Sequence, residues 1–232
     1  MISISLCKIY RFLGFAILGL TIANLTVQIA RFSLLLDRQS SIYRLLNVNN
    51  EANIPTWYST VALLVCVLLL GLIAILKQQQ KDRLTNHWRG LALLFLFLSI
   101  DEAVSLHEKL NPLMRSLLNV NENLLFLWVI PGVVFVGAIA LIYWRFLTRL
   151  PPQMRNLIFF SAALYLSGAI GFELVTGLAV RNISGLHPLI LVLIVAIEEL
   201  LEMLGILIFI RSLLLYLGDN FPAISIHFAQ KD

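Results

Sequence analysis

Acidic residues interrupt two of the most apolar stretches of the chain, LFLSIDEAVSLHEKL and IVAIEELLEMLG. Seven acids lie within otherwise apolar segments: Asp101, Glu102, Glu108, Glu173, Glu198, Glu199 and Glu202. An acid at the centre of a bilayer costs about 2.5 to 3.5 kcal/mol on insertion scales. We therefore expect these side chains to face the interior of a helical bundle and to serve a function there.

Crowded carboxylates in a low-dielectric interior must either take up protons or bind a cation. The predicted ligands of a divalent metal are Asp101, Glu102, His107, Glu173, Glu198 and Glu202. An oxygen-rich set with one imidazole favours iron or manganese over zinc, which usually takes more His or Cys ligands. The Glu-x-x-His pairs of di-iron carboxylate bundles do not occur in this sequence, so only the ligand chemistry is shared with those bundles.

The composition places these acids in a membrane protein. The chain has 232 residues, of which 59% are apolar and 13% are charged. Soluble domains are about 45–50% apolar and about 25% charged. The net charge of +4 comes from short basic clusters between apolar runs, which excludes a nucleic-acid partner and indicates membrane lipid around the chain. Composition and charge identify neither partner proteins nor the particular membrane.

Six apolar stretches are long enough to cross about 30 Å of hydrocarbon as helices. They are residues 10–32, 55–76, 90–110, 124–147, 157–180 and 189–217. Proline-containing connectors separate several of them, and Pro188 is expected at the first position of the last helix. The sequence predicts an all-α, polytopic integral membrane protein with one transmembrane domain, 1–232, built as a bundle of six helices.

The basic residues predict the orientation. Eleven of the 17 Lys and Arg residues lie on the side of the two termini and six on the other side. The positive-inside rule then places both termini in the cytoplasm. The longest outer connector, residues 33–57, fits either a short surface helix or an irregular loop.

The same geometry predicts the depth of the acids. Counting about 1.5 Å per helical residue from the outer ends, the acids of three helices lie roughly 10–15 Å below the outer surface. Glu202 lies one turn deeper, and His107 and Glu108 are shallower. If residues 90–110 form one helix, Asp101, Ser105 and Glu108 share a stripe. The predicted carboxylate cluster would open to the outer side.

Other residues predict packing and anchoring. Close helix contacts are expected at Gly14, Gly19, Gly168, Gly171 and Gly205. Membrane-interface anchoring is expected of Trp57, Trp88, Trp128 and Trp144. Pro131 and Gly132 are expected to bend the fourth span.

Three functions fit this pattern. The first is a metal-dependent membrane enzyme, an oxidoreductase or hydrolase acting on a lipid-soluble or interfacial substrate. The second is a proton- or cation-coupled transporter or channel that uses the same acids as an ion path, with Pro131 and Gly132 as a hinge. The third is a non-catalytic membrane assembly subunit. Metal content, ion flux and co-purifying partners distinguish the three.

Overall fold

The computed structural model of the chain describes residues 6–33, 35–49, 53–119, 126–183 and 187–221. The regular elements of these residues are helices. They are α1 (Leu6–Phe32), α2 (Ser41–Leu46), α3 (Ile54–Gln79), α4 (Thr85–Val104), α5 (Leu110–Leu118), α6 (Val129–Thr148), α7 (Pro152–Leu166), the π-helix η1 (Ser167–Phe172), α8 (Glu173–Asn182) and α9 (Pro188–Asn220). The prediction of an all-helical fold is confirmed for this part of the chain.

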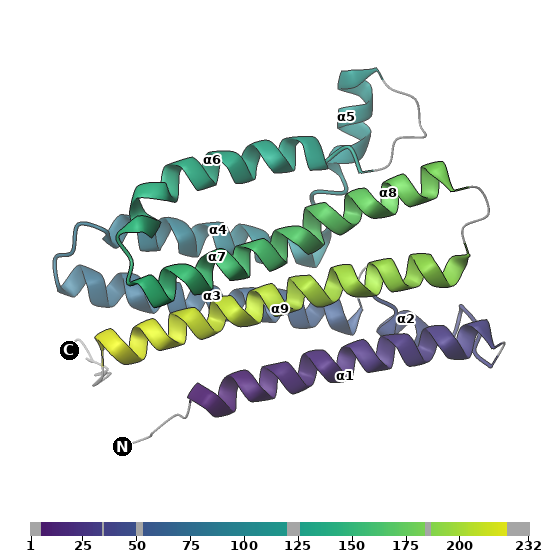
Figure 1. Cartoon of the computed structure of the whole chain (residues 1–232), viewed down its shortest axis with the longest axis horizontal. Coiled ribbons are helices and arrows are strands. Elements are labelled where there is room, and N and C mark those ends of the chain that lie inside the picture. The colour runs from purple at the N-terminus through teal and green to yellow at the C-terminus, as the bar shows by residue number, and fades with distance from the viewer. Residues whose placement is uncertain (1–5, 34, 50–52, 120–125, 184–186, 222–232) are drawn as a thin grey trace, which may run out of the picture.

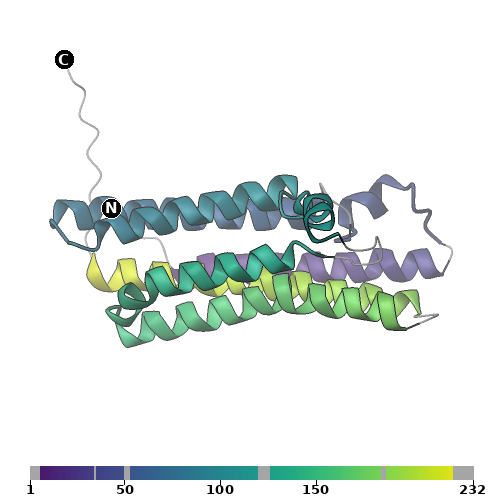
Figure 2. The same ribbon diagram turned by 90° about the horizontal axis from the view of Figure 1, so that it is seen from above.

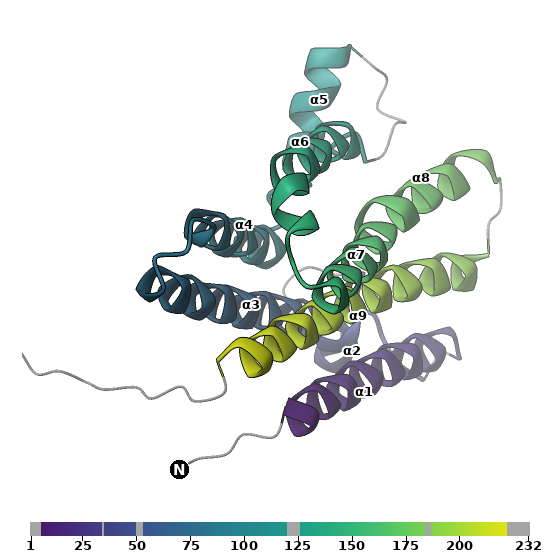
Figure 3. The same cartoon turned by 60° about the vertical axis from the view of Figure 1, so that its left-hand side comes forward.

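The long helices lie side by side along one axis (Figure 1). The closest pairs are α3 with α4 and α7 with α9, and α9 also contacts α1, α3 and η1. In Figure 2, α3 and α4 form one layer, and α6, α7 and α8 lie on the opposite side. In Figure 3, α5 and α6 stand at the edge of the bundle away from α1. The central helix is therefore α9.

Within the described residues, four helical segments are long and apolar enough to cross a membrane: Lys8–Phe32, Ile54–Gln79, Val129–Thr148 and Pro152–Asn182. The last of these is the continuous helix formed by α7, η1 and α8. These four segments are compatible with a multi-pass membrane protein. The other two predicted spans correspond to α4, which has 20 residues, and α9, which has 33, and neither is among these four segments. Asp101 and Glu102 lie on α4, Glu198, Glu199 and Glu202 lie on α9, and Glu108 lies beyond the end of α4.

Prolines start three of the long helices. Asn53 caps α3 by accepting a 2.7 Å hydrogen bond from the backbone N–H of Thr56. His187 caps α9 in the same way, and Pro188 occupies the first turn as predicted. Proline suits these positions because the first backbone N–H groups of a helix have no intrahelical acceptor.

The turn between α3 and α4 is held by Asp82. Its Oδ1 accepts a 2.8 Å hydrogen bond from the N–H of Leu84, and its Oδ2 lies 3.2 Å from Nζ of Lys77. The Leu84 hydrogen bond and the Lys77 charge hold the pKa of Asp82 below its usual range. The two helices are thereby fixed as an antiparallel pair.

Buried apolar side chains are concentrated toward the end of the bundle that contains this turn. The core includes Cys66, Leu70, Ile73, Trp88, Phe146, Met154, Ile206, Ile210 and Leu213. Trp88 meets Phe146 edge to face at 5.0 Å between ring centroids, and Phe95 stacks on Phe209 at 4.4 Å. On α9 the core residues begin at Ile206, one turn beyond Glu202. The acids therefore lie at the edge of this core and toward the opposite end.

Two predicted helix boundaries are wrong. The third span was expected to run to residue 110, but α4 ends at Val104 because Ser105 adopts the left-handed conformation with φ 49°. The stripe of Asp101, Ser105 and Glu108 therefore does not exist. The fourth span was expected to begin at residue 124, but α6 begins at Val129, which puts Pro131 in its first turn. A proline there removes no helical hydrogen bond, so the predicted hinge is also wrong.

The structure contradicts the anchoring prediction for two of the four tryptophans. Trp57 and Trp144 are 67% and 58% exposed, and their anchoring stays a prediction. Trp88 and Trp128 are only 1% and 9% exposed and therefore belong to the interior. An apolar ring near the end of a span predicts anchoring only when no neighbouring helix covers it.

The predicted close helix contacts are found at some of the five glycines and not at others. A Cβ atom at Gly168 or Gly205 would come within 2.8 Å of a neighbouring helix, so these two contacts are confirmed. A Cβ atom at Gly14 would meet Leu207 at an ordinary 3.8 Å. A Cβ atom at Gly19 would meet nothing within 4 Å, and one at Gly171 only Leu166 of the same helix. Among the five predicted glycines, the close approach is between α9 and the α7–η1 segment.

Candidate functional site

The predicted metal ligands lie on three helices and one turn. Asp101 and Glu102 occupy the last turn of α4, and His107 lies in the turn that follows it. Glu173 is the first residue of α8, directly after η1. Glu198 and Glu202 lie on α9, as does Glu199, which was not predicted as a ligand.

Asp101 and His107 form a closed local pair. Oδ1 of Asp101 accepts a 2.8 Å hydrogen bond from the backbone N–H of His107, and Oδ2 lies 2.8 Å from Nδ1 of the same residue. These bonds offset the left-handed conformation at Ser105, which a residue other than glycine adopts at a cost of about 1–3 kcal/mol. A carboxylate on one imidazole nitrogen fixes the ring and leaves Nε2 for another partner. Asp101 is therefore arranged to orient His107.

Trp128 connects this turn to Glu173. Its Nε1–H donates a 2.8 Å hydrogen bond to Oε1 of Glu173, which is 7% exposed. Its ring lies 4.6 Å from the ring of His107, measured between centroids. Its backbone N–H donates to Oδ1 of Asn111 at 2.9 Å. Residues from the α4–α5 turn, the start of α6 and the start of α8 thus meet around one indole.

The sequence missed this role of Trp128. Its position near the end of an apolar stretch was assigned to anchoring, because the hydrogen-bond acceptor lies 45 residues further along the chain. One signal was available: a buried indole N–H nearly always has an acceptor.

The remaining acids interact electrostatically across helices. Glu102 of α4 interacts with both Glu199 and Glu202 of α9. Glu198 interacts with Glu173 and with His107. These pairs link acids on α4, α8 and α9, although the helices are far apart in the sequence.

Tyr165 of α7 is a second residue that the sequence did not indicate. It interacts electrostatically with Glu202 and Glu102 and, more weakly, with Asp101 and Glu199. It also supplies the backbone against which Gly205 packs, with 2.8 Å between a Cβ at Gly205 and the Tyr165 nitrogen. Tyr165 is thus placed among the acids by the close approach of α7 to α9.

A π-helical segment faces the acids of α9. A Cβ at Gly168 of η1 would lie 2.7 Å from the carbonyl oxygen of Glu198 and 2.8 Å from Cγ of Glu202. The wider π turn ends at Phe172, so Glu173 opens the next α-helical segment. Single π turns within α-helices are frequent at functional sites. Here the π turn sets the rotation of Glu173 relative to α7.

Within the described residues, Lys and Arg side chains do not balance the charges of these acids. Among the residues that the structure describes, no Lys or Arg forms an ion pair with Asp101, Glu102, Glu173, Glu198, Glu199 or Glu202. Within the same residues, no three His, Cys, Asp or Glu side chains are close enough together to hold a metal ion without rearrangement. Of the six predicted ligands, direct hydrogen bonding joins Asp101 to His107, and electrostatic interactions relate Glu102, Glu173, Glu198 and Glu202.

One prediction tests the Trp128 contact. Replacing Trp128 with Phe keeps most of the apolar surface but removes the donor to buried Glu173, which should lower the stability of the folded protein by about 1–3 kcal/mol. Thermal unfolding in detergent measures the loss. Trp57→Phe is the matched control, because Trp57 is 67% exposed and should tolerate the change. Equal melting temperatures for the two variants would contradict the assigned role.

The chain belongs to the family described as a domain of unknown function (DUF8692), whose model matches residues 12–217. No curated protein and no solved structure matched the chain in the other two comparisons. Fold and site therefore carry the functional argument.

Proposed function

We propose that this member of the DUF8692 family is a multi-pass membrane protein whose acids on α4, α8 and α9 bind a divalent cation. The bound cation would serve an enzyme that acts on a lipid-soluble or interfacial substrate. Iron or manganese would supply redox chemistry, and another divalent ion would supply Lewis-acid hydrolysis. Six spans are proposed, formed by α1, α3, α4, α6, the α7–α8 helix and α9, with both termini in the cytoplasm.

The observation that carries this proposal is the lack of charge compensation. Acids from three helices interact with one another, and none of them pairs with a Lys or Arg of the described residues. Several carboxylates in a low-dielectric interior cannot all stay ionised without a counter-cation. A divalent cation satisfies this requirement with oxygen ligands.

The residues divide into ligands and positioning groups. We propose Glu102, Glu198, Glu202 and His107 as ligands, with His107 binding through Nε2. Asp101 was predicted as a ligand, but both of its oxygens contact His107, so we propose that it positions the imidazole instead. Glu173 has one oxygen held by Trp128 and its second oxygen available as a ligand. Coordination would require these side chains to move closer together than they lie in the structure.

The apolar core supports an enzyme over a transporter. An ion that reached the acids would meet Ile206, Phe209, Ile210 and Leu213 on α9, which are all at most 5% exposed. Such a packed floor offers an ion no polar path onward. The third candidate, an assembly subunit, has no specific contact in its favour.

Elemental analysis of the purified full-length protein tests the metal proposal. We expect about one or two iron or manganese ions per chain when no chelator is used, as a carboxylate site requires. Folded protein that contains no metal after growth and purification with added iron and manganese would refute the proposal.

The orientation has its own test. A C-terminal reporter that is active only in the cytoplasm should be active when fused after Asp232. Activity of an outside-specific reporter at the same position would overturn both the even number of spans and the assignment of the acids to the outer half.

A further inference from the structure

A second polar site lies toward the N-terminal end of α9, before the turns that carry Glu198 and Glu202. A cavity of about 460 Å³ opens between the end of α1, α2 with the residues that follow it, and the first two turns of α9. We refer to it as the arginine pocket. Its cationic lining residues are Arg31, Arg38 and Arg44. No acidic residue is among the described residues that line it.

A buried hydrogen-bond chain builds the polar wall of the arginine pocket. Nη1 of Arg31 donates to the Tyr43 hydroxyl at 3.0 Å, and that hydroxyl donates to Oε1 of Gln28 at 3.3 Å. Nε2 of Gln28 donates to Oδ1 of Asn47 at 2.6 Å. Gln28, Tyr43 and Asn47 are 2%, 6% and 3% exposed. The wall is therefore rigid, and it holds one guanidinium in place.

Aromatic rings support the same guanidinium. The Arg31 Cζ atom lies 5.2 Å from the centroid of the Phe32 ring and 5.5 Å from that of Tyr43. Tyr43 accepts from one of the five N–H donors that a guanidinium carries. Stacked guanidinium groups are well suited to bind planar or tetrahedral oxyanions.

The opposite wall is apolar. It consists of Leu191, Val192 and Val195 of α9. Leu191 and Val192 are adjacent, and Val195 lies about one helical turn further along. Pro188 also lines the pocket, so the positive end of the α9 dipole adds to the field of the three arginines. A ligand of this pocket must therefore be anionic at one end and apolar at the other.

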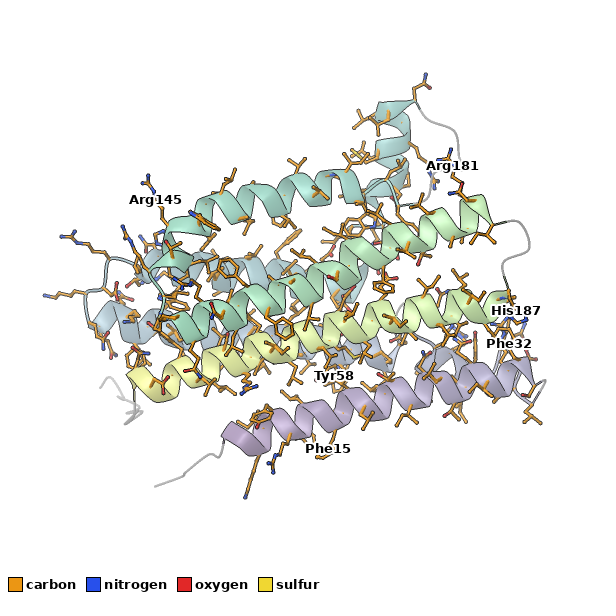
Figure 4. The ribbon with its side chains drawn as sticks, viewed as in Figure 1. Phe15, Phe32, Tyr58, Arg145, Arg181 and His187 are labelled. Atoms are coloured by element: carbon orange, nitrogen blue, oxygen red, sulfur yellow. The ribbon has the colours of Figure 1, made fainter. Side chains whose placement is uncertain are left out.

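The pocket is placed where a lipid headgroup would lie. It is bounded by the C-terminal end of α1 and the N-terminal end of α9, and Phe32 and His187 mark these ends in Figure 4. Their rings lie 6.5 Å apart, measured between centroids. In a six-span arrangement both helix ends reach the membrane surface. The volume of the arginine pocket, about 460 Å³, lies within the range of about 300–1,000 Å³ that is usual for ligand pockets.

We infer that the arginine pocket binds the phosphate group of an anionic phospholipid, with an acyl chain along Leu191, Val192 and Val195. The three arginines supply charge-assisted hydrogen bonds to phosphate oxygens. Basic pockets between membrane helices bind phosphate headgroups by the same chemistry. The inference depends on the membrane placement of α1 and α9 but not on a cation at the acids.

Calorimetric titration of the full-length protein in detergent tests the inference. The probes are dihexanoyl phosphatidylglycerol, dihexanoyl phosphatidylcholine and inorganic phosphate. We expect phosphatidylglycerol to bind at least about tenfold more tightly than either of the others, because only it combines net negative charge with acyl chains. Equal binding of phosphate alone would identify a free anion as the ligand and overturn the lipid assignment. Equal binding of phosphatidylcholine would overturn the role of net charge.

Substitutions of exposed arginines provide a second test, because changes to exposed side chains should leave the fold intact. The double change Arg38→Gln with Arg44→Gln removes two charges from side chains that are both exposed, and it should weaken phosphatidylglycerol binding about tenfold or more. The control is Arg145→Gln with Arg181→Gln, which removes the same charge from residues outside the pocket lining (Figure 4). Equal affinities of the two double variants would refute the inference. Their metal content should be unchanged, which separates this outcome from the test of the proposed function.

Discussion

Replacing both Glu198 and Glu202 with Gln is expected to abolish stoichiometric metal binding. The change removes two proposed carboxylate ligands from one face of α9 and leaves neutral amides, which are much weaker ligands for iron or manganese. Elemental analysis of the purified variant should show a loss of more than about 90% of the metal bound by the parent protein, as expected for two lost ligands. Asp219→Asn is the control on the same helix, because Asp219 is exposed near its end.

The single change Glu202→Gln distinguishes a binding site from a structural brace. In chelator, Glu202→Gln should be as stable as the parent or more stable, because it relieves repulsion with Glu102, Glu199, Glu198 and Glu173. If Glu202 were instead the ionised partner of a buried cation, its neutralisation would destabilise the protein by about 3–5 kcal/mol. Thermal unfolding with and without chelator measures the difference. A metal-independent loss of stability in Glu202→Gln would count against the site.

The second large effect is expected at Gly205. A Cβ atom there would lie 2.8 Å from both the Cβ and the backbone nitrogen of Tyr165 and 3.0 Å from the carbonyl oxygen of Ser161. These are mostly backbone atoms of α7, so the clash is relieved only by moving one helix away from the other. Gly205→Ala should lower stability by about 1–3 kcal/mol, in the range for overpacking. It should also weaken metal binding, because Tyr165 and the acids share this contact.

Gly71→Ala in α3 is the matched control for Gly205→Ala. Both glycines lie inside long helices, but a Cβ atom at Gly71 would meet nothing within 4 Å. Alanine is favoured over glycine in a helix by about 1 kcal/mol, so the control should be neutral or stabilising. A melting temperature for Gly205→Ala that equals or exceeds that of Gly71→Ala would show that α7 and α9 are not in close contact.

The sequence by itself determined the long helices and the side chains that could take part in chemistry. Apolar stretches of sufficient length predicted every long helix, and Pro188 marked the start of α9. These are local properties: a helix forms its backbone hydrogen bonds within its own segment, so composition and end signals suffice to predict it. Gly168 and Gly205 were also identified locally, because small residues permit close helix contact wherever a partner helix is available.

Only the tertiary structure decided where α4 ends and what Trp128 does. Ser105 leaves the helix because Asp101 binds the backbone and ring of His107, and no propensity scale includes such a bond. Trp128 is buried because Glu173, distant in the sequence, accepts its N–H. The arginine pocket likewise needs α1, α2 and α9 together. The burial of Trp128 and the arginine pocket depend on contacts between separate segments, whose free energy is set by the packing of the helices and not by any one stretch of sequence.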